Sequence, residues 1–244
     1  MRSYYYWLDI GPSTARDCAE LSIKSMIFSG ELGPGEKLPP ERILSQQLGV
    51  SRVPLREALK SLESTGFIRT TVGAKGGSRV SDARILVGCW HEWLRANAHK
   101  LSDLLEFRRT IDMQIASLAA ERRTEEDLRE LRTLTDSMDD SPTWINLSHT
   151  QFHRALCQAA HNEYFERATN AIQAELFAPV QTDLEDLSVP TLRTLHEDIL
   201  TAVEAQDPAR AAEAMQVHLE FTEKMFFHRM DELGLNTNGS GRNT

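Results

Sequence analysis

This 244-residue sequence lacks long apolar runs, a paired set of cysteines and, beyond its first third, any strand pattern. No run approaches the roughly 18 apolar residues that a membrane span requires, and the start shows no signal-peptide pattern. The three cysteines, Cys18, Cys89 and Cys157, are odd in number and far apart, which predicts reduced thiols in a cytoplasm. The composition, 41% hydrophobic and 26% charged, is typical of a soluble globular protein.

Positive charge is scarce and unevenly distributed. The net charge is −9, which by itself argues against a nucleic-acid partner. However, residues 1–82 contain 11 Lys and Arg against 9 Asp and Glu, whereas residues 83–244 contain 16 against 27. Exposed charges are screened beyond about 8–10 Å at ordinary salt. A mildly basic first part can therefore bind DNA while an acidic second part lies away from the duplex.

A helix-turn-helix motif is indicated in the first third of the chain. We expect Ser51 to cap a helix through its hydroxyl, with a shorter helix over about 41–48 before it. Arg52, Arg56 and Lys60 lie four residues apart and form one cationic stripe. On the other side, apolar residues recur at the spacing of a buried face: Leu55, Ala58, Leu59 and Leu62. Two short helices with a basic start on the second are typical of a DNA reader, the alternative being a solvated helical hairpin.

A β-hairpin is predicted directly after this motif. Residues 67–71 and 78–81 have the pattern of strands, and the glycine-rich stretch 72–77 between them carries the cation Lys75. The glycines allow the backbone to approach a phosphate or the minor groove closely. A hairpin in this place is a wing, and it favours the DNA-binding interpretation over the plain helical hairpin.

The rest of the chain has only helical patterns. The expected helices cover roughly 83–99, 101–121, 124–138, 143–160, 162–177, 190–206 and 208–233. The acidic stretch 179–190 is predicted to be a mobile loop, and the polar end of the chain a disordered tail. We therefore predict a mainly α protein. Its parts would be a winged helix-turn-helix domain over 1–82, an all-helical bundle domain over 83–235 and a tail over 236–244.

Four histidines of the helical part form a candidate site. His149 and His153 are four residues apart on one expected helix, so both imidazoles point the same way. His196 lies on a later helix and His218 on the last long one, and three helices of a bundle can bring such side chains together. The alternative is chance, because pairs at this spacing are common. The other histidines share no such pattern and are assigned to the surface or core: His91, His99, His161 and His228.

Short motifs occur in a fixed order over nearly the whole chain. Over about 15–80 they are Leu38-Pro39-Pro40-Glu41-Arg42, Gly49-Val50-Ser51-Arg52, Leu55-Arg56-Glu57-Ala58-Leu59 and Leu62-Glu63-Ser64-Thr65-Gly66. The later ones include Glu106-Phe107-Arg108, Leu118-Ala119-Ala120-Glu121-Arg122, Phe152-His153-Arg154-Ala155-Leu156 and His218-Leu219. The first set resembles the N-terminal domain of GntR-family bacterial transcription regulators. The second resembles the all-helical FCD domain of the FadR-like subfamily.

The resemblance implies a DNA-binding transcription regulator. It would be a homodimer that binds a short palindromic operator in double-stranded DNA and responds to a small organic or sugar acid. Repression is the commoner mode in the family, so we expect a repressor. Matched residue by residue, the DNA contacts would be Arg42, Ser51, Arg52, Val53, Arg56 and Gly73. The chemistry agrees, because arginine can bind guanine O6 and N7 together, and Ser51 with helix N-terminal amides suits phosphate.

The sequence departs from the family pattern at two positions. Pro40 stands where a serine cap is common, so the shorter helix is expected to start on proline geometry. His149 stands where metal-binding FCD domains carry an aspartate, four residues before the histidine of the Phe-His motif. The expected ligands of a divalent metal, Zn or Ni, are then His149, His153, His196 and His218.

The charge of such a site indicates the kind of effector. Four neutral ligands leave the +2 charge of the ion uncompensated, which favours an anion. Arg108 matches the arginine of the family's Glu-x-Arg motif and is the expected second contact for a carboxylate, the alternative being an ordinary ion pair.

Two other functions stay open beside the metal-dependent regulator. One is a regulator of the same family with a purely organic effector pocket and no metal. The other is a helical metalloenzyme, against which the sequence offers no Glu or Asp beside the histidine pair at the spacing of a general base. We expect a regulator and not an enzyme.

Overall fold

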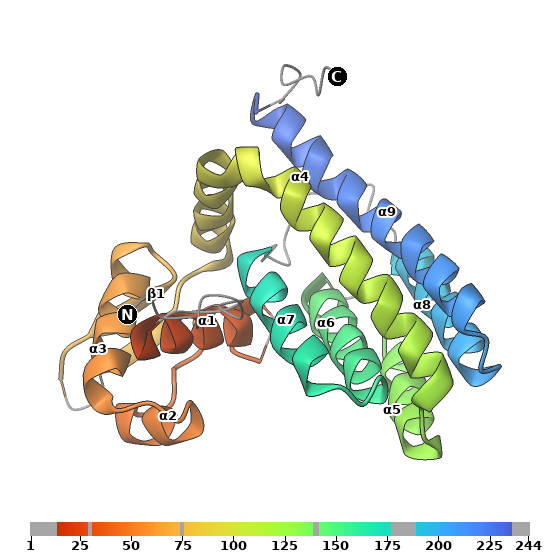
Figure 1. Ribbon diagram of the computed structural model, residues 1–244. Coiled ribbons are helices and arrows are strands. Elements are labelled where there is room, and N and C mark those ends of the chain that lie inside the picture. Colours follow the sequence, from red (N-terminus) through yellow and green to blue (C-terminus); the bar gives the residue numbers. More distant parts are fainter. Residues whose placement is uncertain (1–13, 29–30, 74–75, 139–141, 177–188, 236–244) are drawn as a thin grey trace, which may run out of the picture.

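A computed structural model of the protein describes residues 14–28, 31–73, 76–138, 142–176 and 189–235 (Figure 1). Within these ranges it is mainly helical, as predicted, with one two-stranded sheet. The elements are α1 (Ala15–Phe28), α2 (Glu41–Gln47), α3 (Arg52–Ser64), β1 (Ile68–Thr71), β2 (Gly77–Val80), α4 (Ala83–Arg122), α5 (Glu125–Asp136), α6 (Pro142–Ala159), α7 (Glu163–Glu175), α8 (Val189–Glu204) and α9 (Pro208–Glu232). The predicted tail and most of the predicted acidic loop, residues 179–188, lie outside the described residues.

The first elements form the predicted winged helix-turn-helix. Helix α3 buries the predicted apolar face, consisting of Leu55, Ala58, Leu59 and Leu62. Strands β1 and β2 pair antiparallel, with Ile68 opposite Val80 and Thr71 opposite Gly77. Gly77 has φ +128°, a backbone conformation that a residue with a side chain adopts only under strain, so the wing favours glycine at this position.

The start of α3 differs from the prediction for Ser51. Ser51 is the N-cap residue, with the expected extended backbone, but its hydroxyl makes no capping hydrogen bond. A capping side chain accepts from the amide of the second or third helical residue. The third residue here is Pro54, which has no N–H, and no bond forms to the amide of the second. The hydroxyl is therefore not used by the helix. The preceding helix starts as expected, with Pro40 at its N-cap.

The prediction of separate helices over 83–99 and 101–121 was wrong, because α4 is one continuous helix. Ser102 followed by an aspartate is a typical start signal, but here Ser102 is an exposed residue inside α4. Leu101 and Leu105, which are both buried, carry the apolar face across the predicted break. Packing of this face therefore overrides the local signal.

Helix α4 changes direction part-way along (Figure 1). Asn97 donates its side-chain amide to the Trp93 carbonyl at 2.9 Å, and side-chain bonds to helix carbonyls are one cause of bending. The first part of α4 packs on the winged helix, where the Cys89 thiol donates to the Thr65 carbonyl. The remainder runs antiparallel to α9 in the bundle (Figure 1). Arg109 of α4 and the buried Glu223 of α9 join the two helices by an ion pair.

A hydrophobic core continues from the winged helix into the helical part. It includes buried residues of α1 and α3 together with others from α4, α7 and α9. The contributors are Ile172 of α7, Leu176 at its C-cap, and Phe226 and Met230 of α9. Figure 1 shows α1 lying close to α7, and the two helices are in contact. The two parts of the chain therefore share apolar packing beyond the link through α4.

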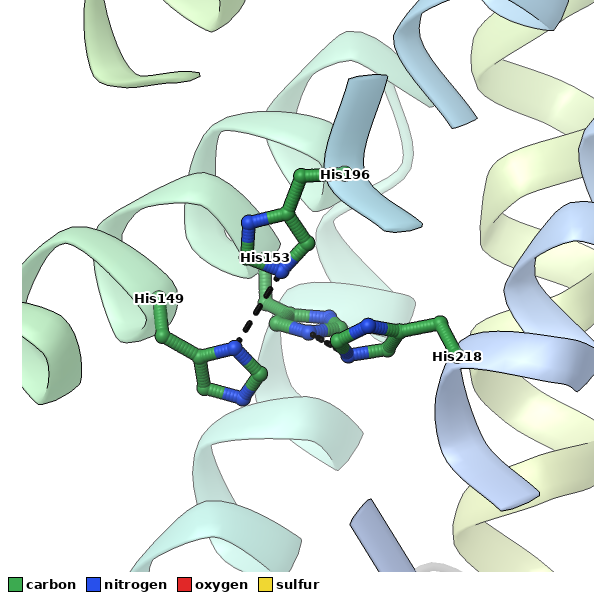
Figure 2. A group of neighbouring side chains, drawn as sticks. All are labelled: His149, His153, His196 and His218. Atoms are coloured by element: carbon green, nitrogen blue, oxygen red, sulfur yellow. Dashed lines mark hydrogen bonds between the residues drawn. The ribbon is translucent and has the colours of Figure 1, made fainter. Parts of the chain in front are cut away.

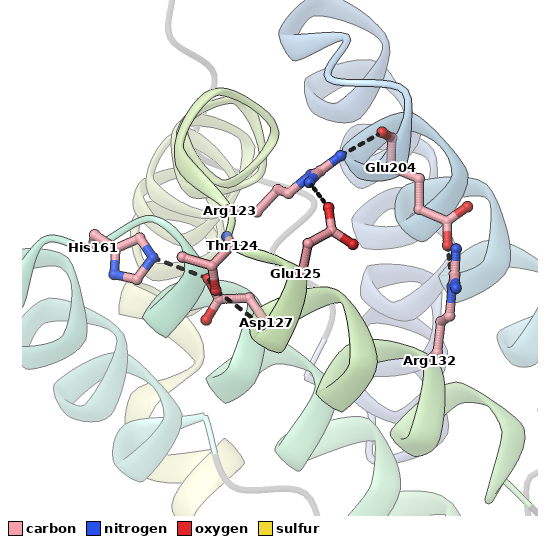
Figure 3. A network of polar contacts seen from close by, with 7 residues as sticks. All are labelled: Arg123, Thr124, Glu125, Asp127, Arg132, His161 and Glu204. Carbon is pink, nitrogen blue, oxygen red and sulfur yellow. Dashed lines mark hydrogen bonds and ion pairs between the residues drawn. The ribbon is translucent and has the colours of Figure 1, made fainter.

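Polar contacts fix the ends of the bundle helices relative to one another (Figure 3). Thr124 and Asp127 form a capping box at the start of α5, and His161 contacts the Asp127 carboxylate at 3.0 Å. Arg123 donates to the Glu204 carbonyl at the C-terminus of α8. Arg122 donates in the same way to the Ala160 carbonyl after α6. The two helices that carry the histidines of α6 and α8 are thus held at their C-terminal ends by Arg122, the last residue of α4, and Arg123, its C-cap.

No helix among the described residues is both long and apolar enough to cross a bilayer.

We expect Thr124→Ala to lower the free energy of unfolding by about 1 kcal/mol, because the amide of Asp127 loses its capping partner. Urea denaturation followed by circular dichroism measures the change. Thr133→Ala is the matched control, since Thr133 is an exposed threonine inside the same helix, and it should change stability by less than about 0.5 kcal/mol. Equal effects of the two substitutions would contradict the role of the capping box.

Candidate metal centre and nucleic-acid interface

The structure brings the four predicted histidines together (Figure 2). His149 and His153 are one turn apart on α6, His196 comes from α8 and His218 from α9. Their candidate ligand nitrogens all lie within 4.8 Å of one another. Nδ1 of His149 is 3.2 Å from Nε2 of His196, and Nε2 of His153 is 2.9 Å from Nε2 of His218. The packing of α6, α8 and α9 therefore brings four imidazole nitrogens close to one point.

The donor set fits a divalent ion that prefers imidazole. Metal–nitrogen distances of about 2.0–2.1 Å place two nitrogens on one ion roughly 3–4 Å apart, close to the separations of 3.2 Å and 2.9 Å between the two bonded pairs. One neighbour of the cluster is apolar, since the Phe152 ring is stacked on His196 at a centroid distance of 4.3 Å. Nδ1 of His218 is buried without a partner, and Nδ1 of His196 lies 3.3 Å from the Met138 sulfur. The outer nitrogens of these two rings therefore lack the carboxylate partners common around metal-bound histidines.

Burial keeps the imidazoles neutral. Desolvation, with a smaller effect of the Arg108 charge, lowers the pKa of His149 to about 3. The pKa of His153, His196 and His218 is also well below its ordinary value, and burial is the main cause for each. A neutral imidazole is the form that binds a metal. The cluster can therefore bind an ion at physiological pH without first losing protons.

Arg108 lies on α4 near this cluster. Its charge contributes to lowering the pKa of His149, His153 and His218, so the guanidinium is within electrostatic range of the rings. Its Nε donates to Asp112 at 3.2 Å, and both side chains are nearly buried. Arg108 thus forms an ion pair, which was the alternative to effector binding, and its place beside the histidines is compatible with both.

Sequence reasoning missed Asp112, the ion-pair partner of Arg108. It is a buried carboxyl, and desolvation raises its pKa above the ordinary value while Arg108 acts in the opposite direction. The signal that was available is its position four residues after Arg108 on one helix, where the two side chains meet. The cluster of four histidines contains no carboxylate among the described residues.

The predicted DNA contacts lie on exposed parts of the winged helix. Arg42 is on α2, Ser51, Arg52, Val53 and Arg56 are at the start of α3, and Gly73 follows β1 with φ +128°. Nε of Arg56 donates to Glu41 of α2 at 2.8 Å. Both side chains of this pair are well exposed, so the pair adds little stability and can exchange partners. Sequence reasoning missed this contact, because it joins two helices.

Family models match both parts of the chain. The model for bacterial regulatory proteins of the gntR family matches residues 16–77, and that for the FCD domain matches residues 103–221. The Bacillus subtilis regulator YcbG is 30% identical over 214 residues, which are 86% of this chain and 89% of that protein. The chain belongs to the GntR family of bacterial regulatory proteins. It carries a GntR DNA-binding domain and an FCD domain, as the motifs predicted.

Two further similarities agree with this assignment. The B. subtilis transcriptional regulator LutR is 30% identical over 216 residues, covering 85% of this chain and 99% of that protein. The solved structure of Escherichia coli McbR/YncC matches 89% of this chain and 99% of its own with a TM-score of 0.54. At 20% identity this structure supports the fold alone. This GntR-family chain is therefore a DNA-binding transcriptional regulator with an FCD effector domain.

We expect the metal-free protein to lose stability as the pH falls below about 6.5. The unfolded histidines take up protons near that pH, whereas the folded cluster resists protonation down to much lower pH, to about 3 for His149. Each neutral histidine then costs about 1.4 kcal/mol per pH unit below that point. Urea unfolding of EDTA-treated protein at several pH values between about 7.5 and 5.5 measures the slope.

In the same measurement His153→Gln should reduce the slope by about 1.4 kcal/mol per pH unit, which corresponds to one proton fewer taken up on unfolding. Thr133→Ala, which changes no titratable group, should leave the slope as in the wild type. A free energy of unfolding that is constant over this pH range would show that the buried cluster does not stay neutral.

Proposed function

We propose that this GntR-family protein is a cytoplasmic repressor that binds a palindromic operator as a homodimer. In this proposal a small organic or sugar acid, bound at a divalent metal in the helical domain, controls the affinity for DNA. The observation that carries the proposal is the convergence of four neutral imidazoles beside Arg108, in the same chain as a winged helix with an exposed cationic stripe.

The winged helix would supply the contacts to DNA. Arg52 and Arg56 are one turn apart at the exposed start of α3, where helix-turn-helix proteins contact base edges. A bidentate arginine–guanine contact discriminates by about 1–3 kcal/mol. The Ser51 hydroxyl, which the helix leaves unused, lies beside the first amides of α3 and suits a phosphate oxygen. In a two-fold symmetric dimer, two such helices read half-sites about one helical turn apart.

The histidine cluster would supply the effector site. His149, His153, His196 and His218 would hold Zn or Ni, because imidazole suits both ions. The ion would supply a positive charge that attracts a carboxylate, since its protein ligands are uncharged. Arg108 would provide a second contact by directing part of its guanidinium from Asp112 to the effector.

The packing offers a route from this site to the DNA. Helix α6 carries His149 and His153, and α7 follows it after a short turn. Ile172 of α7 and Leu176, its C-cap residue, share the core with Ile23 and Ile27 of α1, in the winged helix. A shift of α6 on effector binding would therefore move a helix that contacts the DNA-binding domain. In a dimer such a shift changes the spacing of the two recognition helices.

Two alternatives remain as competing proposals. A regulator of the same family without a metal would bind its effector in an organic pocket, and binding that persists in EDTA favours it. A metalloenzyme would need a group to act as general base, and the cluster holds no carboxylate among the described residues. The family assignment also disfavours the enzyme.

We expect Arg52→Ala and Arg56→Ala each to weaken binding of operator DNA by at least about tenfold near 150 mM salt. The probe is a duplex that the wild-type protein has selected from a random double-stranded library, and fluorescence anisotropy measures the affinity. Binding of the wild type should also weaken steeply as salt increases, because several phosphates are contacted. Arg129→Ala, at an exposed arginine of α5, is the control and should bind as the wild type does. Unchanged affinity in both α3 variants would mean that α3 is not the recognition helix.

We expect protein purified without a polyhistidine tag to contain close to one divalent ion per chain, measured by elemental analysis. His153→Ala should lose the ion, and His149→Ala shows whether the other three histidines suffice.

In thermal-shift screening, small carboxylates should raise the melting temperature of the metal-loaded protein, by mass action, and should do so less in Arg108→Ala. EDTA should abolish the shift. A metal-free protein that still binds a carboxylate would contradict the metal-dependent proposal and support the organic pocket.

A further inference from the structure

Two valines are exposed on the elements that would face DNA. Among the large apolar side chains of the described residues, Val72 and Val53 are the most exposed, at 103% and 68%. Val72 follows β1 at the start of the wing loop, and Val53 is the second residue of α3. Exposure of a single aliphatic side chain is ordinary. The coincidence of the two largest exposures with the two DNA-facing elements is what points to a contact.

The position of Val53 in α3 directs it to the major groove. Arg52 precedes it and Arg56 follows three residues later, so the valine lies between two exposed cations at the start of the helix. N-terminal residues of a recognition helix are those that reach base edges. The side chain is β-branched and therefore stiff, so little conformational entropy is lost when it is fixed. Pro54, the next residue, restricts the backbone of this turn further.

A valine can read only one feature of a base edge in that groove. It has no hydrogen-bond donor or acceptor in its side chain, and the apolar group displayed in the major groove is the C5 methyl of thymine. We propose that Val53 contacts this methyl group and selects thymine at one position in each half-site. This inference rests on the proposed binding of operator DNA, and it adds a specificity-determining residue to that function.

Val72 provides an internal comparison. A wing enters the minor groove, where adenine–thymine pairs display only acceptors and no methyl group. Val72 would therefore contribute apolar contact to the duplex without distinguishing thymine from uracil. The two exposed valines thus differ in their expected response to removal of the thymine methyl.

Deoxyuridine gives a direct test, because it pairs as thymidine does and lacks only the methyl group. The probe is again a duplex selected by the wild-type protein from a random library, remade with deoxyuridine at one thymidine position at a time. Loss of one buried methyl corresponds to about a fourfold change in affinity. We expect one position per half-site at which deoxyuridine weakens binding by about fourfold, and about 15-fold when both half-sites are changed.

Two variants identify the residue that reads the methyl. In Val53→Ser the ratio of the affinity for the thymidine duplex to that for the deoxyuridine duplex should fall to about 1, since the serine cannot replace the apolar contact. In Val72→Ala the ratio should stay at about fourfold, whatever the change in overall affinity. Because Val53 is well exposed, its replacement should leave the melting temperature as in the wild type, which separates loss of the contact from loss of the fold.

The outcomes separate this inference from the function on which it rests. Specific binding of the wild type with no deoxyuridine effect at any position would overturn the thymine contact and leave DNA binding standing. A deoxyuridine effect that persists in Val53→Ser would assign the methyl to another residue and also overturn it. Absence of any sequence-specific binding would mean that the proposed function itself had failed.

Discussion

The convergence of four imidazoles, three of them buried, is the constraint on which the helical domain depends. Their nitrogens are polar, yet His153, His196 and His218 are almost completely removed from water, and the ring hydrogen bonds join His153 to His218 and His196 to His149. Buried polar groups without full partners are costly, so the packing of α6, α8 and α9 must be strong enough to hold them there. A fold that maintains such a cluster in the absence of charge is preorganised for a cation, since ligation would satisfy the inner nitrogens together.

That preorganisation depends on how the helix ends are fixed. Consecutive arginines at the end of α4, Arg122 and Arg123, donate to the carbonyls that follow α6 and end α8. These carbonyls have no intrahelical partner, and cationic donors are favourable there because of the helix dipole. Helices α6 and α8, with their histidines, are therefore positioned relative to α4, which also carries Arg108. A single helix thus positions the metal ligands and the cation beside them.

Local chemistry explains which parts of this arrangement could be predicted from sequence. The apolar face of α3 and the start of α5 at Thr124 depend on spacing and capping within one segment, and both are as expected. The pairing of Arg56 with Glu41 depends on two segments packing together, which periodicity does not describe. The continuity of α4 could not be predicted without knowing which helices pack against it, since the burial of Leu101 and Leu105 overrides a helix-start signal at Ser102. Convergence of the histidines was predictable from resemblance, but their neutrality and the partner of Arg108 were not.

The mildly basic winged helix and the acidic helical domain pack against each other through apolar residues. The acidic helical part contacts the winged helix through apolar residues of α4, α7 and α9, while the cations of α3 point outward. Among the acidic residues of the winged helix, Glu41 pairs with Arg56 of the recognition helix. A phosphate or a base acceptor must compete with this carboxylate for the guanidinium. Because the pair is exposed, the competition costs little, and it disfavours weak, non-specific contacts more than a well-placed bidentate one. The same exposed turn that carries this pair also displays Val53, so charge and apolar contact are offered to DNA from adjacent positions on one helix.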